Sequence, residues 1–180
     1  MPADTLVDQE RLVSLTVNAA SDVFNMMLGL PMIPGVAYTE QTVSPKDGLI
    51  VSLVGITGPW IGTGMIRCDR DFACKIASSM LMADYQEVNE EVLDAMAEMA
   101  NMVFGNVKTN LEELLGNLGL SIPTVIFGSN FATRGVGKQT WNVVQVQSGA
   151  DSLELRICLS PHRSTSYCPH ARGAASWKPE

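Results

Sequence analysis

One long helix is the feature that most constrains how this 180-residue chain can fold. Between residues 93 and 114, apolar side chains recur every three or four positions, which places them on one side of an α-helix. These side chains are Leu93, Met96, Ala100, Val103, Val107, Leu111 and Leu114. Asn89 is the expected N-cap, with Glu90 and Glu91 in the first turn, and Gly116 is the expected terminator. The apolar side of such a helix must lie against a core supplied by the rest of the chain.

A polar stripe runs along the outward side of the same helix. It consists of Asp94, Glu98, Asn101, Gly105, Lys108 and Glu112, at alternating spacings of four and three residues. Glu98 and Asn101 therefore lie one turn apart with neighbouring side chains. Gly105 has no side chain, which leaves room for another molecule to approach Asn101. Met99 and Met102 fall beside the stripes and are candidates to border this site.

The chemistry of this pair suits a shared active site better than a self-contained one. A carboxamide both accepts and donates hydrogen bonds, so Asn101 can hold a water in line for attack without titrating. Glu98 can pair with a cation on a partner. Such groups fit hydrolysis of a phosphoryl group that the partner already polarises, where positioning supplies much of the catalysis. An exposed Glu and Asn are commonly only solvated, so the spacing alone defines a site and not a reaction.

The other predicted elements describe an α+β domain. Helices are expected over residues 9–30 and 71–84, and strands over 36–43, 49–56, 60–68, 121–127, 139–147 and 153–159. The first three strands, with a turn at Lys46-Asp47-Gly48, predict an antiparallel meander, and Pro34 and Gly35 are interpreted as part of the break after the first helix. Gly62 and Gly64 predict close packing or a bulge. The expected fold is an antiparallel sheet of about six strands packed with two long helices and one shorter helix.

Composition narrows the class of protein. The net charge is −7 with 12 Lys and Arg, so no basic stripe for nucleic acid is visible, and no apolar run approaches the roughly 18 residues that span a bilayer. The first ten residues are polar and acidic, so we expect no signal peptide and a cytoplasmic protein. Cys168, His162 and His170 have poor spacing for a metal, and none is expected. Residues 1–160 are expected to form one domain, and 161–180 a disordered tail.

The polar stripe resembles a known family motif. The CheC, CheX and FliY phosphatases of bacterial chemotaxis share a D/S-x3-E-x2-N motif with a proline some 22 residues later. Asp94, Glu98 and Asn101 fit this spacing, and Pro123 lies 22 residues after Asn101. The stretch EMANMVFGNVK at 98–108 is similar to the CheX type, and SIPTVIFG at 121–128 is similar to the family's following strand. The resemblance covers roughly residues 8–160 and implies a CheC-like fold.

The resemblance also implies roles for individual residues. The partner would be a phosphorylated CheY-like receiver domain of two-component signalling, which supplies its aspartyl phosphate and Mg²⁺, while this chain binds no cofactor. Asn101 would orient the attacking water, and Glu98 would pair with the receiver's lysine. Asp94, Met102, Gly105 and Lys108 would border the contact, and Pro123 would shape the following strand.

Three questions stay open at this point. The first helix lacks an E-x2-N motif, which favours the CheX type with one site per chain. The resemblance to the CheX type also implies a homodimer, whose two chains could pair through the hairpin between residues 139 and 159. A non-catalytic adaptor that binds or sequesters a phosphorylated receiver is the main alternative. A coincidental motif on an unrelated α/β scaffold is the other, and it would be supported by an Asn101 buried in the core.

Overall fold

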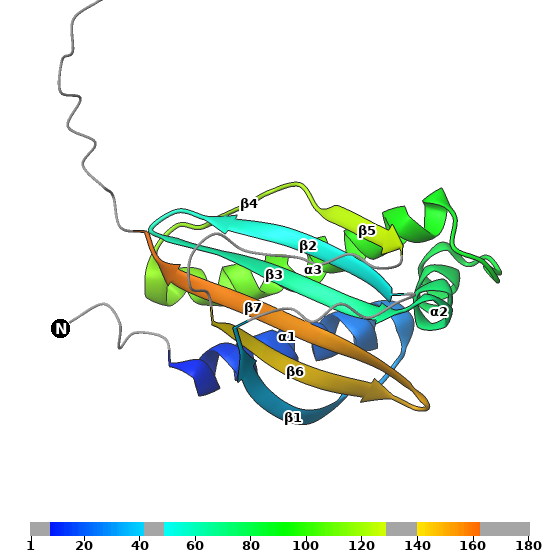
Figure 1. Cartoon of the computed structure of the whole chain (residues 1–180), viewed down its shortest axis with the longest axis horizontal. Helices are drawn as coiled ribbons and strands as arrows, with labels where there is room; N and C mark the ends of the chain where they lie inside the picture. Colours follow the sequence, from blue (N-terminus) through cyan, green and yellow to red (C-terminus); the bar gives the residue numbers. More distant parts are fainter. Residues whose placement is uncertain (1–7, 42–48, 129–139, 163–180) are drawn as a thin grey trace, which may run out of the picture.

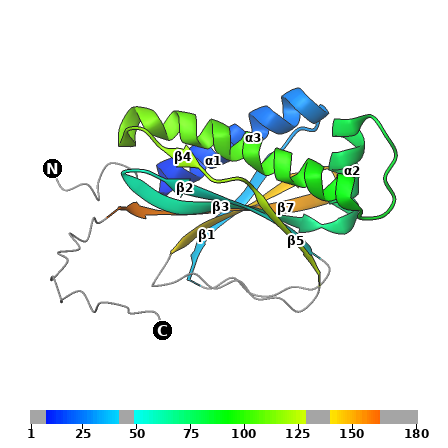
Figure 2. The ribbon, with the colours of Figure 1, turned by 90° about the horizontal axis from the view of Figure 1, so that it is seen from above.

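One antiparallel sheet carries three helices on a single face (Figures 1 and 2). We describe a computed structural model, which defines residues 8–41, 49–128 and 140–162. The helices are α1 (Gln9–Leu28), α2 (Arg70–Leu81) and α3 (Glu90–Leu115). The strands are β1 (Ile33–Glu40), β2 (Leu49–Thr57), β3 (Trp60–Asp69), β4 (Gly119–Leu120), β5 (Thr124–Gly128), β6 (Trp141–Ser148) and β7 (Asp151–Pro161). This arrangement confirms the predicted α+β class, with two long helices and one shorter helix.

The helix boundaries follow from their capping residues. Asn89 Oδ1 accepts a hydrogen bond from the Val92 backbone N–H at 3.0 Å, which starts α3 at the predicted position. Gly116, with φ of 81°, ends α3 in a backbone conformation that favours glycine. Asp69 caps α2 in the same way, through a 2.8 Å hydrogen bond from the Phe72 N–H. Local capping chemistry therefore fixes both ends of the helix that carries the polar stripe.

The predicted meander of the first three strands is wrong in one respect. The strands β2 and β3 do form a hairpin, but β1 pairs with β6 at the far edge of the sheet, whose order is β1-β6-β7-β3-β2-β4, with β5 also paired to β2. Since β7 occupies the other side of β3, and β4 and β5 occupy the other side of β2, no neighbouring position is left for β1. Pro34 and Gly35 lie inside β1, where the register shifts. A proline that cannot donate to the ladder is tolerated at such an edge.

Other expectations for the chain are only partly covered by the structure. The described residues form seven strands, because the predicted strand at 121–127 is replaced by the short β4 and by β5. The Lys46-Asp47-Gly48 turn and residues 163–180 of the predicted tail lie outside the described residues. The hairpin of β6 and β7 offers no free edge for another chain, since each strand already pairs on both sides.

The main core lies between the sheet and the helices. All seven residues of the apolar α3 stripe face it, five of them buried and Leu93 and Leu114 partly buried. A smaller cluster of Val51, Met65, Trp141, Val143 and Cys158 covers the other face of the sheet. There, Arg156 pairs with Glu40 at 2.8 Å, which ties β7 to the end of β1. The two-sided burial holds the sheet as a rigid base for α3.

Candidate functional site

The polar stripe of α3 points away from the core, as its spacing predicts. Asp94, Glu98 and Asn101 are exposed, and Gly105, Lys108 and Glu112 are half-exposed. Burial of the opposite stripe turns these side chains outward, because both stripes belong to one rigid helix. An exposed Asn101 contradicts the hypothesis of a coincidental motif with this residue in the core.

Glu98 and Asn101 are not committed to other parts of the fold. Neither side chain has a hydrogen bond or an ion pair with any residue in the described part of the chain. They lie one helical turn apart, so their Cβ atoms are about 5–6 Å from each other. An acceptor carboxylate and a donor–acceptor amide are thus presented together to solvent. The pair is positioned to bind a group brought by another molecule.

Gly105 is open on the outward side, one turn after Asn101. A Cβ atom built at this glycine would meet no atom within 4 Å. The helix therefore has no packing requirement for glycine here, although glycine costs up to about 1 kcal/mol relative to alanine inside a helix. The predicted space for close approach to Asn101 is present.

Lys108 is engaged within the chain. Its Nζ lies 2.8 Å from Glu112 Oε2, and the other Glu112 oxygen accepts a hydrogen bond from the Leu118 backbone N–H at 2.9 Å. The hydrogen bonds from Lys108 and Leu118 hold the pKa of Glu112 below its ordinary value. Lys108 thus stabilises the turn that follows α3, and only part of its side chain remains for the predicted partner contact.

The methionines beside the stripe differ from each other. Met99 is completely buried in the core, so the expectation that it borders the site is wrong. The spacing places Met99 beside the apolar stripe, and the elements that pack against α3 cover its side chain. Met102 is half-buried and packs against the core, which leaves part of its side chain accessible.

The segment after α3 returns beside the helix (Figure 2). Pro123 is half-buried and directly precedes β5, the strand that it is predicted to shape. Two apolar side chains of this segment are exposed, Ile122 at 87% and Phe127 at 46%. Both fall within the strand predicted over 121–127, whereas Ile122 lies before β5 begins. In the sequence, only the position of Ile122 directly before Pro123 could have indicated that it lies outside the strand.

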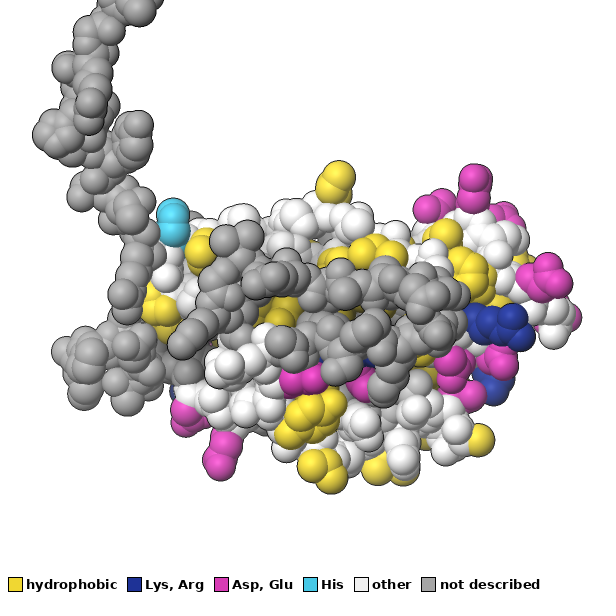
Figure 3. Space-filling model, in the orientation of Figure 1, with side chains coloured by type: hydrophobic (Ala, Val, Ile, Leu, Met, Phe, Trp, Pro, Cys, Tyr) yellow, Lys and Arg dark blue, Asp and Glu magenta, His cyan; other side chains and the backbone are white. Residues whose placement is uncertain are grey.

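The charge around the site is strongly negative. The exposed acidic side chains of the α2–α3 connection and the first half of α3 are Asp84, Glu87, Glu90, Glu91, Asp94 and Glu98. The sequence contains no Lys, Arg or His between residues 81 and 107. Acidic side chains gather at the end of the molecule formed by α2 and the start of α3 (Figure 3). A partner with a basic surface is therefore favoured, and its approach would be sensitive to salt.

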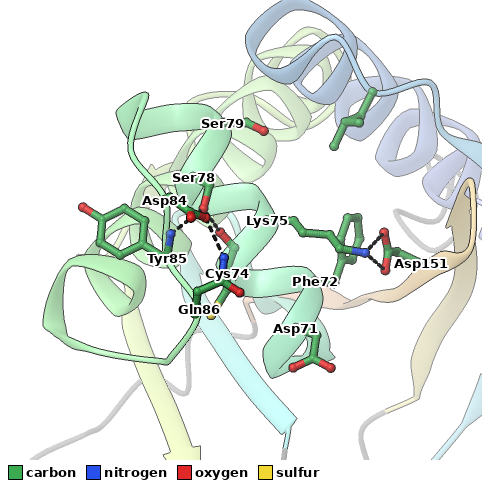
Figure 4. Close-up of a pocket in the computed structure, with 11 residues that line it drawn as sticks. Asp71, Phe72, Cys74, Lys75, Ser78, Ser79, Asp84, Tyr85, Gln86 and Asp151 are labelled. Atoms are coloured by element: carbon green, nitrogen blue, oxygen red, sulfur yellow. Dashed lines mark hydrogen bonds and ion pairs between the residues drawn. The ribbon is translucent and has the colours of Figure 1, made fainter.

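A separate hollow of about 500 Å³ lies along α2 (Figure 4), and no residue of the polar stripe lines it. Lys75 Nζ lies in it, 2.7 and 2.8 Å from the two carboxylate oxygens of Asp151. Cys74 also lines it, and burial raises the pKa of this thiol. A protonated thiol and a paired ammonium are poor nucleophiles. Neither Cys74 nor Lys75 is therefore a candidate nucleophile in this hollow.

Two further findings concern membranes and metal ions. The described residues contain no helix long and apolar enough to cross a membrane. In the same residues, no group of three or more His, Cys, Asp and Glu side chains is arranged to hold a metal ion.

Comparison with solved structures defines the class of protein. A CheC-like superfamily protein from Shewanella sp. PV-4 superposes with a TM-score of 0.73 at 21% identity, covering 83% of this chain and 97% of that one. A chain of the CheX–CheY–BeF₃–Mg²⁺ complex from Borrelia burgdorferi superposes with a TM-score of 0.67 at 22% identity, covering 82% of this chain and 97% of that one. The fold is that of the CheC-like proteins, as predicted.

Sequence comparison identifies the family within this class. The model of the family described as chemotaxis phosphatase CheX matches residues 50–146, more than half of the chain. The CheY-P phosphatase CheX of Thermotoga maritima is 26% identical over 128 residues, covering 71% of this chain and 82% of that protein. This chain belongs to the CheX family of chemotaxis phosphatases, which confirms the predicted family and its enzymatic class.

The hydrogen bonds that Glu112 accepts from Lys108 and Leu118 predict a pH-dependent contribution to stability. Because its pKa in the folded chain is below the ordinary value of 4.5, Glu112 stabilises the fold above about pH 4.5, and this contribution is lost as the pH falls through the lower folded value. We expect Glu112→Gln to lower the urea midpoint at pH 7 and to differ less from the unchanged protein at pH 3. Glu113→Gln removes the same charge one residue later and is the matched control. Equal effects of the two variants at every pH would contradict this account.

Proposed function

We propose that this chain hydrolyses the aspartyl phosphate of a CheY-like receiver domain, with Asn101 and Glu98 as its catalytic residues. One observation carries the proposal: in a chain of the CheX family, these two side chains are exposed, adjacent and free of partners in the described structure. The relative from Thermotoga maritima, named CheY-P phosphatase, supports the substrate. Its name and the motif thus point to the same reaction.

In this mechanism, Asn101 positions the water. Its side-chain oxygen accepts a hydrogen bond from the water, and its NH₂ group is available to a phosphoryl oxygen. The water attacks phosphorus as the bond to the aspartyl oxygen breaks, which yields inorganic phosphate and a free aspartate on the receiver. An amide stays neutral across the physiological pH range, so Asn101 contributes orientation and not proton transfer. Open space at Gly105 allows the receiver loops to reach it.

Glu98 aligns the two proteins in our proposal. Its carboxylate is one turn from Asn101 and would pair with the lysine of the receiver active site. The exposed acidic side chains around it add a field that attracts a basic surface. Salt should therefore weaken the encounter more than it slows the chemical step. Asp94 and the exposed part of Met102 would lie at the border of this contact.

The Mg²⁺ ion belongs to the receiver in this proposal. The structure from Borrelia burgdorferi contains CheX together with CheY, BeF₃ and Mg²⁺. In our account, the ion neutralises charge on the phosphoryl group when the receiver docks, and this chain contributes the water-orienting amide. The two proteins would then each supply half of one active site, in the cytoplasm.

A homodimer is also part of our proposal. The β6–β7 hairpin is an unsuitable contact, because both strands pair on both sides within the chain. An edge strand such as β1 would be the available alternative, since among the described strands β1 pairs with β6 alone. Dimerisation through that edge would leave the outward face of α3 accessible.

Asn101→Ala should abolish most of the activity while leaving the complex intact. One positioned group of this kind contributes on the order of 10²–10⁴-fold to a rate, so we expect a loss within that range. The measurement is the decay of aspartyl phosphate on receiver domains from the same genome, at saturating concentrations of this chain. Asn110→Ala is the matched control, because Asn110 is an exposed asparagine of α3 outside the polar stripe.

The same assay separates the enzyme from the adaptor. An enzyme shortens the lifetime of the phosphorylated receiver, whereas an adaptor binds it tightly without faster decay. Unchanged activity of Asn101→Ala would refute the assigned role. Tight binding by the unchanged protein without acceleration would establish the adaptor instead.

A side chain at Gly105 should affect stability and activity in opposite directions. Gly105→Gln removes a helix-destabilising glycine without a clash inside the chain, so we expect a gain of up to about 1 kcal/mol in the free energy of unfolding. The same side chain would obstruct the receiver and raise the KM for dephosphorylation. Asn110→Gln provides the control, and an unaltered KM for Gly105→Gln would place the docking surface elsewhere.

A further inference from the structure

One close contact between α3 and the sheet involves the side chain three residues after Asn101. Phe104 is completely buried, and its ring rests on the backbone of β3 at Gly64. A Cβ atom at Gly64 would overlap the ring at Cγ, Cδ1 and Cε1. Gly64 therefore forms a notch that only glycine can provide while the ring occupies it. The predicted close packing at this glycine is confirmed, and its partner is now identified.

The notch has rigid walls on both sides. Gly64 pairs with Val54 of the neighbouring β2 and with Ile157 of the neighbouring β7. Both side chains are buried in the same core cluster as Phe104. Since the floor of the notch is backbone in the middle of the sheet, it cannot yield as a flexible side chain would. The ring is thus held against the backbone of a strand that is paired on both sides.

Phe104 is also close to the proposed catalytic residues along the helix. It lies three residues after Asn101 and directly before Gly105. A roll of α3 by about 10° would move a side-chain tip about 6 Å from the helix axis by about 1 Å. Displacements of that size can reduce a rate by about 10²-fold. The angle at which α3 sits on the sheet therefore decides where the Asn101 amide points.

We infer that Phe104, seated in the Gly64 notch, is a positioning residue that sets the roll and height of α3 and thereby the direction of the Asn101 amide. This inference rests on the proposed function. It assigns Phe104 no contact with the substrate, and it predicts that disturbing the notch impairs the chemical step more than the binding of the receiver.

A double-mutant cycle tests this assignment. Gly64→Ala introduces a methyl group that displaces the ring, and Phe104→Leu leaves the notch partly empty. We expect each to lower kcat for dephosphorylation by about tenfold or more, with less than about threefold change in the dissociation constant for the receiver loaded with BeF₃ and Mg²⁺. The double variant, in which the added methyl group fills the vacated space, should recover most of the lost kcat.

The control distinguishes positioning from general destabilisation. Leu111→Val shortens another completely buried side chain of α3, two turns further along. All variants are compared at a temperature where circular dichroism shows them folded; if Gly64→Ala does not fold, Phe104→Leu is compared with Leu111→Val alone. Full kcat in Gly64→Ala or Phe104→Leu, or an equal loss in Leu111→Val, would overturn the inference. An unchanged protein that accelerates no receiver's dephosphorylation would overturn the proposed function as well.

Discussion

The packing of α3 against the sheet is the interaction on which the rest of the structure depends. Its apolar stripe is buried over most of its length, so the helix has one orientation in which the core closes. That orientation turns Glu98 and Asn101 to solvent without a hydrogen bond from either side chain to the described fold. The two site residues therefore contribute little to the stability of the fold, since neither packs in the core. Burial of the opposite side of the same helix sets the direction in which they point.

A site of this kind lacks some of the groups that phosphoryl hydrolysis needs. It offers one neutral amide and one carboxylate on the exposed face of a single helix, among other exposed acidic side chains. These groups can orient a water and align a cationic partner, but they do not polarise a phosphoryl group. In our account the receiver domain supplies the phosphate, the metal ion and the lysine. Catalysis then depends on how accurately α3 is presented, which gives the backbone notch at Gly64 its importance.

The parts predicted from the sequence are those governed by local chemistry. Helix periodicity and the cap at Asn89 located α3 and its outward stripe, because capping and spacing act over a few residues. The partner of β1 was mispredicted, since strand pairing is settled by which distant segments occupy the neighbouring positions. Likewise, Gly64 indicated close packing but not Phe104 as its partner, and the stripe showed Lys108 on the outward face but not its pairing with Glu112, which turns toward Leu118. The contact of Gly64 with Phe104 depends on tertiary geometry, whereas the pairing of Lys108 with Glu112 spans four residues of one helix and is a local interaction that the spacing could have indicated.

The most direct test of the account is a crystal structure of this chain bound to its receiver domain loaded with BeF₃ and Mg²⁺. We predict that the Asn101 amide enters the receiver active site, with its side-chain oxygen within about 3 Å of a water in line with the beryllium–oxygen bond. Glu98 should pair with the receiver lysine in the same complex. A receiver bound elsewhere, with the outward face of α3 still exposed to solvent, would contradict the assignment of the catalytic site.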